Sequence, residues 1–316
     1  MSDQPRRLSR RTFLALAASS TASGAALLAC GGSPALVAPT EGGDDAASGP
    51  ALTTAAPTVT PTPTPRPIPP AGRVERLLLP GTPWETTLVA THSGRPGSAV
   101  MFLGGVHGNE PGGWLAAEEV ASWQPAAGSI LVIPRANIVA TRVLERTLPE
   151  LGDLNRLYPG SPSGMLPMER MAAAVIEVAR EFGVDLLIDM HESWGFFAER
   201  TQNGTAFLGQ TVTSSSGPES ETIAPALIAR ANANIPPGRD RIVTRDQFPL
   251  PGATPATTPP SNATLGRGSS SLSLGRHVPG LTPVLVEMGQ QDQPEHRRVA
   301  LHLEVARAAL ELRGVA

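Results

Sequence analysis

The stretch "SAVMFLGGVHGNEPGG", residues 98–113, indicates the fold of this chain. Its continuous apolar run, Ala99–Gly104, is typical of a strand buried on both faces of a sheet. Glycines and a proline then surround His107 and Glu110, which lie three positions apart. A helix-like run, Trp114–Trp123, follows. The stretch predicts a buried strand, a tight turn and a helix, with two metal-binding residue types in the turn.

The rest of the domain alternates in the same way. Further strands are predicted at Val74–Leu79, Thr86–Thr91, Ser129–Pro134, Val184–Met190 and Pro283–Glu287, and helices at Leu166–Phe182, Ser220–Ile235 and Pro294–Arg313. Residues 135–165 are expected to be irregular, and residues 249–271 to form a long loop. This alternation predicts an α/β three-layer sandwich with a central mixed, largely parallel sheet. Sites in such sheets lie at the carboxyl ends of the strands.

The first 30 residues are typical of an export signal. Four arginines within residues 6–11 precede the apolar segment Phe13–Leu28. Residues 9–14, "SRRTFL", resemble a twin-arginine motif, and residues 27–30, "LLAC", resemble a lipobox that ends at Cys30, the only cysteine. A chance cysteine in an Ala-rich segment is the alternative. We expect an exported protein, lipid-anchored through Cys30 on the outer face of the cytoplasmic membrane or in the periplasm.

Residues 31–71 are rich in Gly, Ala, Thr and Pro, and such a composition predicts a disordered tether. One globular domain is then expected over residues 72–316. The net charge of −3 gives no reason to expect nucleic acid as a partner. Every basic residue is an arginine, so catalysis through a Schiff-base lysine is excluded.

Two of the six histidines directly follow apolar runs that predict buried strands. His107 follows "VMFLGGV" and His191 follows "LLIDM". Two imidazoles and the Glu110 carboxylate are a three-ligand zinc set that leaves one coordination position open. Alternatively, each histidine is a structural group bonded to backbone. His92, His277, His296 and His302 are not expected to be ligands, although His277 could line the pocket.

Five motifs follow one another in a fixed order. They are HGNE (107–110), an arginine, DLNRLYPG (153–160), DMHE (189–192) and VEMG (286–289). This set resembles the zinc carboxypeptidase superfamily, and more closely its succinylglutamate desuccinylase/aspartoacylase branch. The resemblance covers roughly residues 98–291.

The resemblance implies one zinc ion per chain, held by His107, Glu110 and His191. Glu287 matches the catalytic glutamate, although it could be a buried structural carboxylate. Asp153 matches the carboxylate that orients the first ligand histidine, with capping of the local turn as the alternative.

The resemblance also implies how a substrate is held. Asn155 and Arg156 match the pair that binds the substrate carboxylate, a task that suits a planar guanidinium. Arg146 matches the arginine that polarises the scissile carbonyl, and Arg142 is the alternative. Family members often carry a tyrosine that closes on the substrate, whereas the only tyrosine here is Tyr158, inside the LYPG turn.

The function implied is a zinc-dependent hydrolase that cleaves an amide bond next to a carboxylate. It would act as an N-acyl-amino-acid deacylase, or like a carboxypeptidase on peptides or cell-wall fragments. The substrate is then a small acyl-amino acid or peptide with a free carboxylate. A non-catalytic surface lipoprotein that binds a ligand on the same fold is the alternative of a different class. The 249–271 loop could be a lid or an inert insertion.

Overall fold

The computed structural model describes residues 67–201, 204–245 and 269–316. The predicted export signal with Cys30, most of the predicted tether and residues 249–268 of the predicted loop lie outside the described residues. Within the described ranges, no helix combines the length and apolar character that crossing a membrane requires.

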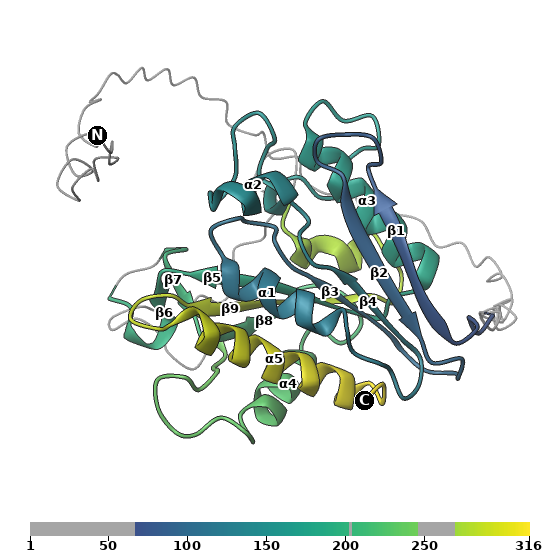
Figure 1. Cartoon of the computed structure of the whole chain (residues 1–316). Helices are drawn as coiled ribbons and strands as arrows, with labels where there is room; N and C mark the ends of the chain where they lie inside the picture. Colours follow the sequence, from purple (N-terminus) through teal and green to yellow (C-terminus); the bar gives the residue numbers. More distant parts are fainter. Residues whose placement is uncertain (1–66, 202–203, 246–268) are drawn as a thin grey trace, which may run out of the picture. The chain divides into compact units, whose positions relative to one another are not determined.

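A seven-stranded sheet forms the centre of the domain (Figure 1). Its strands, in spatial order, are β1 (Gly72–Leu78), β2 (Thr86–His92), β4 (Ser129–Ile133), β3 (Ala99–Leu103), β5 (Leu186–Ser193), β9 (Thr282–Gly289) and β8 (Thr211–Thr213). The four strands β4, β3, β5 and β9 run parallel to their neighbours in this group. The pairs β1–β2, β2–β4 and β8–β9 are antiparallel. The predicted mixed, largely parallel sheet is therefore confirmed.

Helices cover both faces of this sheet and complete the three layers. The helices α1 (Pro111–Val120), α4 (Ile223–Ala231) and α5 (Glu295–Leu312) share one apolar cluster with Val100 and Phe102 of β3. Helix α3 (Pro167–Phe182) shares a second cluster with Met101 and Leu103 of the same strand. Successive side chains of a strand point to opposite faces, so the continuous apolar run of β3 fills two cores.

The structure corrects three expectations about the chain between these elements. Residues 135–165 are not wholly irregular, because they contain α2 (Ile138–Val143) and a short 3-10 helix, η1 (Leu154–Arg156). The Asn137 side chain begins α2 by accepting a hydrogen bond from the backbone of Ala140, a contact that hydrophobic periodicity does not reveal. The first helix was predicted to begin at Trp114. It begins at Pro111 instead, and proline is a residue type favoured in a first helical turn. The end of the predicted loop starts another 3-10 helix, η5 (Ser271–Arg276).

Short elements that the sequence pattern did not predict lie near the ends of β5 and β9. They are the strands β6 (Gly195–Phe196) and β7 (Phe207–Gly209), which pair with each other, the 3-10 helix η2 (Phe197–Glu199), and the edge strand β8. Each is two or three residues long, too short to show a period.

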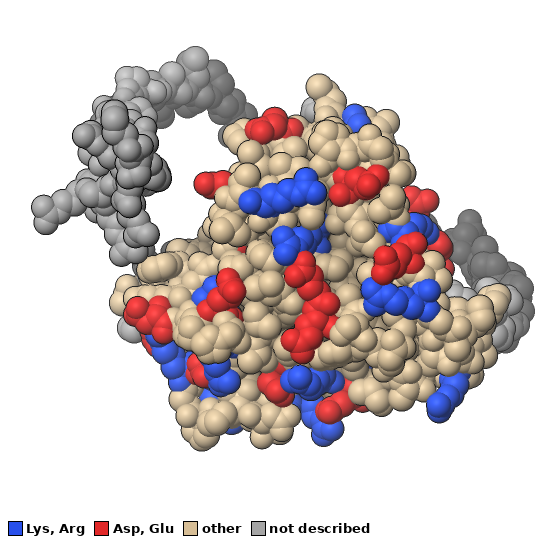
Figure 2. All heavy atoms as spheres, in the orientation of Figure 1, with Lys and Arg blue, Asp and Glu red and all other residues tan. Residues whose placement is uncertain are grey.

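The face of the molecule in Figure 2, which carries α1 and α5, mixes arginines with acidic side chains.

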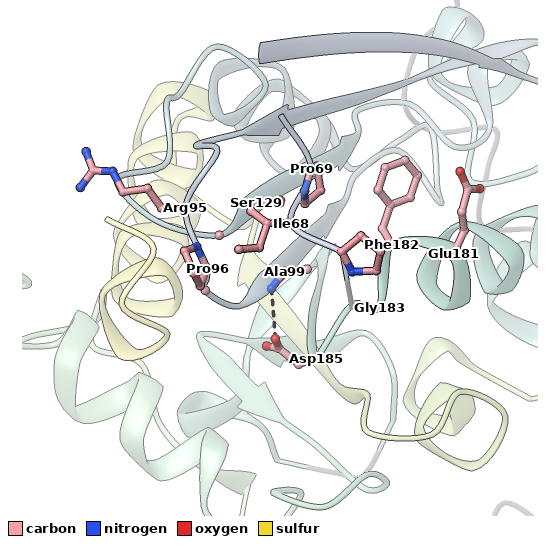
Figure 3. A pocket seen from close by; sticks show the side chains of 13 residues that line it. Ile68, Pro69, Arg95, Pro96, Ala99, Ser129, Glu181, Phe182, Gly183 and Asp185 are labelled. Atoms are coloured by element: carbon pink, nitrogen blue, oxygen red, sulfur yellow. Dashed lines mark hydrogen bonds between the residues drawn. The ribbon is translucent and has the colours of Figure 1, made fainter. Parts of the chain in front are cut away.

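A cavity of about 520 Å³ lies at the amino ends of the parallel strands. We call it the amino-edge cavity; its lining includes Ile68, Arg95, Ser129, Phe182 and Asp185 (Figure 3). The Asp185 carboxylate accepts a hydrogen bond of 3.0 Å from the backbone of Ala99 and lies 3.5 Å from the guanidinium of Arg313. Its Oδ2 atom therefore helps to hold the start of β3, whereas Oδ1 has no hydrogen-bond partner among the described residues.

Candidate active site

The turn between β3 and α1 carries the first two site residues. Gly105 has φ +64°, which favours glycine, and a Cβ atom on Gly108 would overlap the carbonyl oxygen of Ala140. The turn therefore packs tightly against α2 and leads the chain to Glu110, directly before α1. The side chains of His107 and Glu110 are both buried as a result.

The neighbouring strands β5 and β9 carry two more. His191 lies within β5 and Glu287 within β9, and the register of the two strands pairs these residues directly. The sequence predicted that His191 and Glu287 lie at the ends of their strands. Both strands instead continue for two residues beyond this pair, so the two residues lie inside the strands. Their position in a buried parallel pair fixes their spacing through the backbone.

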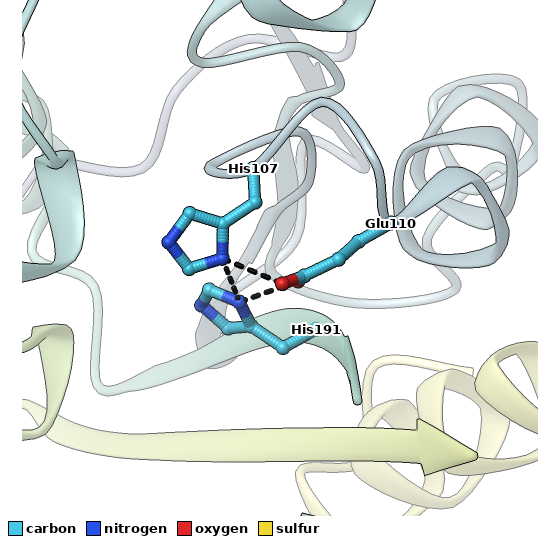
Figure 4. A group of neighbouring side chains, drawn as sticks. All are labelled: His107, Glu110 and His191. Carbon is cyan, nitrogen blue, oxygen red and sulfur yellow. Dashed lines mark hydrogen bonds and ion pairs between the residues drawn. The ribbon is translucent and has the colours of Figure 1, made fainter. Parts of the chain in front are cut away.

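Three side chains from these elements meet in one group (Figure 4). His107 Nδ1 lies 2.7 Å from Glu110 Oε1, and His191 Nδ1 lies 2.8 Å from Glu110 Oε2. The two Nδ1 atoms are 3.1 Å apart. Each residue offers one ligand atom to a space in which these atoms lie within 4.8 Å of one another, so the group could hold a metal ion.

The hydrogen bonds behind the two imidazoles test whether a metal fits. His107 Nε2 faces Asp153 Oδ1 at 3.2 Å, and His191 Nε2 faces Asp189 Oδ2 at 2.9 Å. An Nε2–H group that donates to a carboxylate leaves the Nδ1 lone pair of the neutral ring free. Two lone pairs and the Glu110 carboxylate then converge, and a positive charge between them, from a metal ion or from a proton on an imidazole, relieves their repulsion. The donor set therefore fits a divalent metal such as zinc.

The electrostatics of the group agree with this assignment. Burial lowers the pKa of His191, but the Asp189 and Glu110 carboxylates together raise it well above its ordinary value. Burial raises the pKa of Glu110, yet the charges of His107 and His191 hold it far below its usual range. The buried group thus attracts positive charge.

Asp153 fills both roles considered for it. Its Oδ1 atom accepts from His107 Nε2 and, at 2.9 Å, from the backbone N–H of Asn155 at the start of η1. Burial raises its pKa, but the hydrogen bond to His107 and the charges of His107, Arg146 and Arg156 hold it well below the ordinary value. One carboxylate oxygen therefore orients the histidine and caps the turn.

A cavity of about 220 Å³ opens next to this group, at the carboxyl ends of the parallel strands. We call it the carboxyl-edge cavity. Seven of the sequence-predicted residues line it: His107, Glu110, Arg146, Asn155, Arg156, His191 and Glu287. Asp153 lies behind His107 instead. The structure thus brings together residues that span most of the domain sequence.

Of the two candidate arginines, Arg146 reaches this cavity. Its Nη1 atom lies 3.3 Å from Glu110 Oε1, and its Nη2 atom lies 3.5 Å from Asp153 Oδ2. Its side chain is 45% exposed, which leaves it able to move onto a bound molecule. Arg142 is exposed on α2 and is not among the described residues that line the cavity.

Glu287 combines burial with a free oxygen. The residue is 8% exposed, and its Oε2 atom has no hydrogen-bond partner in the described part of the chain. Burial, together with the charge of Glu110, raises the pKa of its carboxyl to about 7, against the attraction of His191. A carboxylate with a pKa near neutrality is well suited to exchange protons with a reacting group.

The structure adds three residues that the sequence analysis did not assign. Asp189 orients His191; the DMHE motif could have indicated it, because residues i and i+2 of a strand share a face. Arg245 lines the carboxyl-edge cavity. Burial lowers the pKa of its guanidinium, and the charge of Glu287 only partly opposes this shift. Ser271 contacts Asp189. Neither Arg245 nor Ser271 belongs to a motif that sequence reasoning could use.

Two other residues of the sequence motifs, Tyr158 and Glu192, lie outside the cavity lining. Tyr158 is fully buried in the core cluster that includes α3, so it cannot close over a substrate. Glu192 pairs with Arg298 at 2.6 Å and accepts from Gln290, rather than joining the His–Glu–His group. A structural role for Glu192 beside the ligands agrees with these contacts.

Comparisons with known proteins relate these residues to a family. Residues 96–194 match the model of the succinylglutamate desuccinylase/aspartoacylase catalytic domain. The matched region holds His107, Glu110, His191, Asp153 and the residues around them, but it ends before Glu287. None of the curated proteins matches this chain.

Solved structures share the fold at low sequence identity. The cell shape determinant protein Csd4 from Helicobacter pylori is 14% identical with a TM-score of 0.56, over 72% of this chain and 55% of that chain. A succinylglutamate desuccinylase from Silicibacter sp. TM1040 is 18% identical with a TM-score of 0.53, over 79% of this chain and 69% of that one. The match therefore spans little more than half the length of Csd4. Residues 96–194 thus resemble the catalytic domain of the succinylglutamate desuccinylase/aspartoacylase family, and the domain has the fold of solved proteins of that branch.

Proposed function

We propose that this protein is a zinc-dependent hydrolase that cleaves an amide bond next to a carboxylate. One observation carries the proposal: the convergent donor atoms of His107, Glu110 and His191 border the same cavity as the buried Glu287 carboxylate, whose Oε2 atom has no hydrogen-bond partner among the described residues. Zinc bound by these three residues would polarise a carbonyl group and lower the pKa of water.

Glu287 supplies the proton transfers of the proposed reaction. Its free Oε2 atom faces no protein donor among the described residues, so it is available to accept a proton from the attacking water. In the metal-free chain, burial raises the pKa of Glu287 to about 7, so this carboxyl is suited to hold a proton and return it to the leaving amine. Arg146, partly exposed at the same cavity, stabilises the oxyanion of the tetrahedral intermediate.

Asn155 and Arg156 fix the position of the substrate. Both line the cavity. Asp153 bonds both His107 and the backbone N–H of Asn155, and so links this pair to the metal-binding group. The guanidinium of Arg156 and the amide of Asn155 suit a carboxylate on the substrate, and holding it places the scissile bond at a set distance.

Two substrate classes are compatible with this arrangement, and the names of the structural neighbours include one example of each. One neighbour is a succinylglutamate desuccinylase. Csd4 is described as a D,L-carboxypeptidase and has been solved with a tripeptide and with mDAP bound. The proposed export signal and lipid anchor at Cys30 would place this protein among peptides and cell-wall fragments, which favours the peptidase activity. The binding-lipoprotein alternative offers no reason to keep Glu287 beside three metal-binding side chains.

Metal analysis and a substrate screen test the proposal. The purified protein should contain one zinc ion per chain and should release amino acid from N-acyl-amino acids or from short peptides. Substrates whose free carboxylate is amidated should react far more slowly, because Asn155 and Arg156 then lose their partner. A protein that binds no zinc, or that binds zinc and hydrolyses neither class, would contradict it.

A further inference from the structure

Ser271 occupies a buried position between two parts of the site. It is the first residue of η5 and is 0% exposed. Its hydroxyl donates a hydrogen bond of 2.5 Å to Asp189 Oδ2, and its backbone N–H donates one of 3.0 Å to Asn155 Oδ1. Both of its donors are therefore used on residues of the site.

These two partners serve different ends of the carboxyl-edge cavity. Asp189 Oδ2 also accepts from His191 Nε2 at 2.9 Å, so it orients a residue of the metal-binding group. Asn155 lines the end where the substrate carboxylate is proposed to bind. A continuous chain of hydrogen bonds thus runs from His191 through Asp189 and Ser271 to Asn155.

Ser271 fixes the orientation of both partners. A backbone N–H can only donate, so the Asn155 atom that faces it is the oxygen, and the Nδ2 hydrogens are left for a ligand. Asp189 Oδ1 is buried without a hydrogen-bond partner among the described residues, so Oδ2 carries all of the side-chain hydrogen bonds that hold this carboxylate. Without the Ser271 hydroxyl, only His191 itself would hold the carboxylate that orients it.

The backbone around Ser271 is held independently of its hydroxyl. Tyr158 and Ser269 form an antiparallel bridge, with reciprocal backbone hydrogen bonds of 3.1 and 2.9 Å. This bridge joins the start of η5 to the turn that follows Asn155. Replacement of the hydroxyl should therefore leave the path of the chain intact.

We propose that Ser271 is a positioning residue that couples the substrate-carboxylate end of the cavity to the metal ligand His191. This inference rests on the proposed function. Binding of zinc and of a substrate carboxylate should then strengthen each other by the same factor, as linkage requires. Partners behind metal-bound histidines commonly change metal affinity by about 10- to 100-fold.

Zinc alone is a sufficient probe. Zinc affinity is measured by competition with a chelator for the full chain and for Ser271→Ala, Asn155→Ala and the double variant. Ser271→Ala should weaken zinc binding about 10-fold. Asn155 does not contact a metal-binding side chain, so Asn155→Ala should weaken zinc binding by a smaller factor. The double variant should bind zinc about as weakly as Ser271→Ala alone. Effects of residues in one hydrogen-bonded chain are not additive.

Ser273→Ala is the matched control. Ser273 lies in the same short helix and is also buried, but its hydroxyl donates only to the backbone of Ser270, at 2.8 Å. This variant should keep the zinc affinity of the wild type. Equal zinc affinity of Ser271→Ala and wild type, or independent effects of the two single variants, would overturn the inference while leaving the proposed function standing. Failure of the wild type to bind zinc would instead overturn the proposed function.

Discussion

The two edges of the parallel strands carry cavities that differ in size and in chemistry. The amino-edge cavity, of about 520 Å³, is more than twice as large as the carboxyl-edge cavity, of about 220 Å³. Its half-buried carboxylate, Asp185, accepts a hydrogen bond from the Ala99 backbone and lies 3.5 Å from the guanidinium of Arg313. The smaller cavity is lined by the convergent donor group and by Glu287, whose Oε2 atom has no hydrogen-bond partner in the part of the chain that the structure describes.

The difference shows that the convergence of metal-binding side chains on one space locates the site better than cavity volume does. Both edges derive from the same strands, and both contain a histidine, an arginine and an acidic residue nearby. At the amino edge His92 faces Ser129 and Asp185 bonds the backbone of Ala99, and these groups do not converge on a common space. At the carboxyl edge they face a common space, where side chains from successive loops meet. Matched substitutions at the two edges test this contrast.

The largest effect is expected for zinc binding. His191→Ala removes one of three ligands and should weaken zinc affinity by at least about 100-fold. His92→Ala is the counterpart near the amino edge, where the ring lies 2.7 Å from Ser129 Oγ and stacks on Phe182. It should retain one zinc ion per chain. Metal content after dialysis measures both, and equal zinc loss in the two variants would break the contrast between the edges.

Turnover should separate the Glu287 carboxylate from that of Asp185. Glu287→Gln should bind zinc but lower kcat by about 10²- to 10⁴-fold, because the amide cannot accept the proton from water. Asp185→Asn, at the amino edge, should stay within about two-fold of the wild type. Steady-state kinetics on the substrate found in the screen decides the matter. A Glu287→Gln variant with full activity would refute the proposed role of this residue.

The sequence predicted most of the carboxyl edge because its residues lie in short motifs on strong strands. His107, Glu110 and His191 follow or end apolar runs whose burial is evident from composition alone. Alternation of strands and helices sufficed for the three layers, since each apolar run fits one element. Even the choice of Arg146 over Arg142 agrees with the cavity lining.

The remaining features depend on contacts between distant segments. Arg245 and Ser271 reach the site from the two sides of residues 246–268, and no local pattern distinguishes them from other loop residues. The 3-10 helices and the strand β8 are stabilised by pairing and packing against other segments, and their sequences show no hydrophobic period that would predict them. The Asn137 cap of α2 likewise shows itself only once the backbone is in place.

The pH dependence of stability tests the burial of Glu287 in the metal-free protein. Its pKa of about 7 in the folded chain lies above the ordinary value of 4.5, so the folded state binds more protons between these values. This contribution to stability is present below about pH 4.5 and is lost as pH rises through about 7. Glu287→Gln removes the contribution.

Chemical unfolding of the zinc-free proteins at pH 5 and pH 8 measures the contribution of Glu287 to stability. The free energy of unfolding should fall more for the wild type than for Glu287→Gln, by up to about 3 kcal/mol. Parallel pH profiles for the wild type and Glu287→Gln would show that the Glu287 carboxyl is not desolvated in the fold.

The smallest effect is expected for the arginines, because Arg146 is 45% exposed and solvent screens its charge. Arg146→Ala should lower kcat about 10- to 50-fold with little change in zinc content, since the side chain acts on the oxyanion and not on the metal. Arg142→Ala, four residues away on α2, and Arg95→Ala, at the amino-edge cavity, should each stay within about two-fold of the wild type. If Arg142→Ala lost activity and Arg146→Ala did not, the carbonyl-polarising role would move to α2, and the contacts of Arg146 with Glu110 and Asp153 would be structural only.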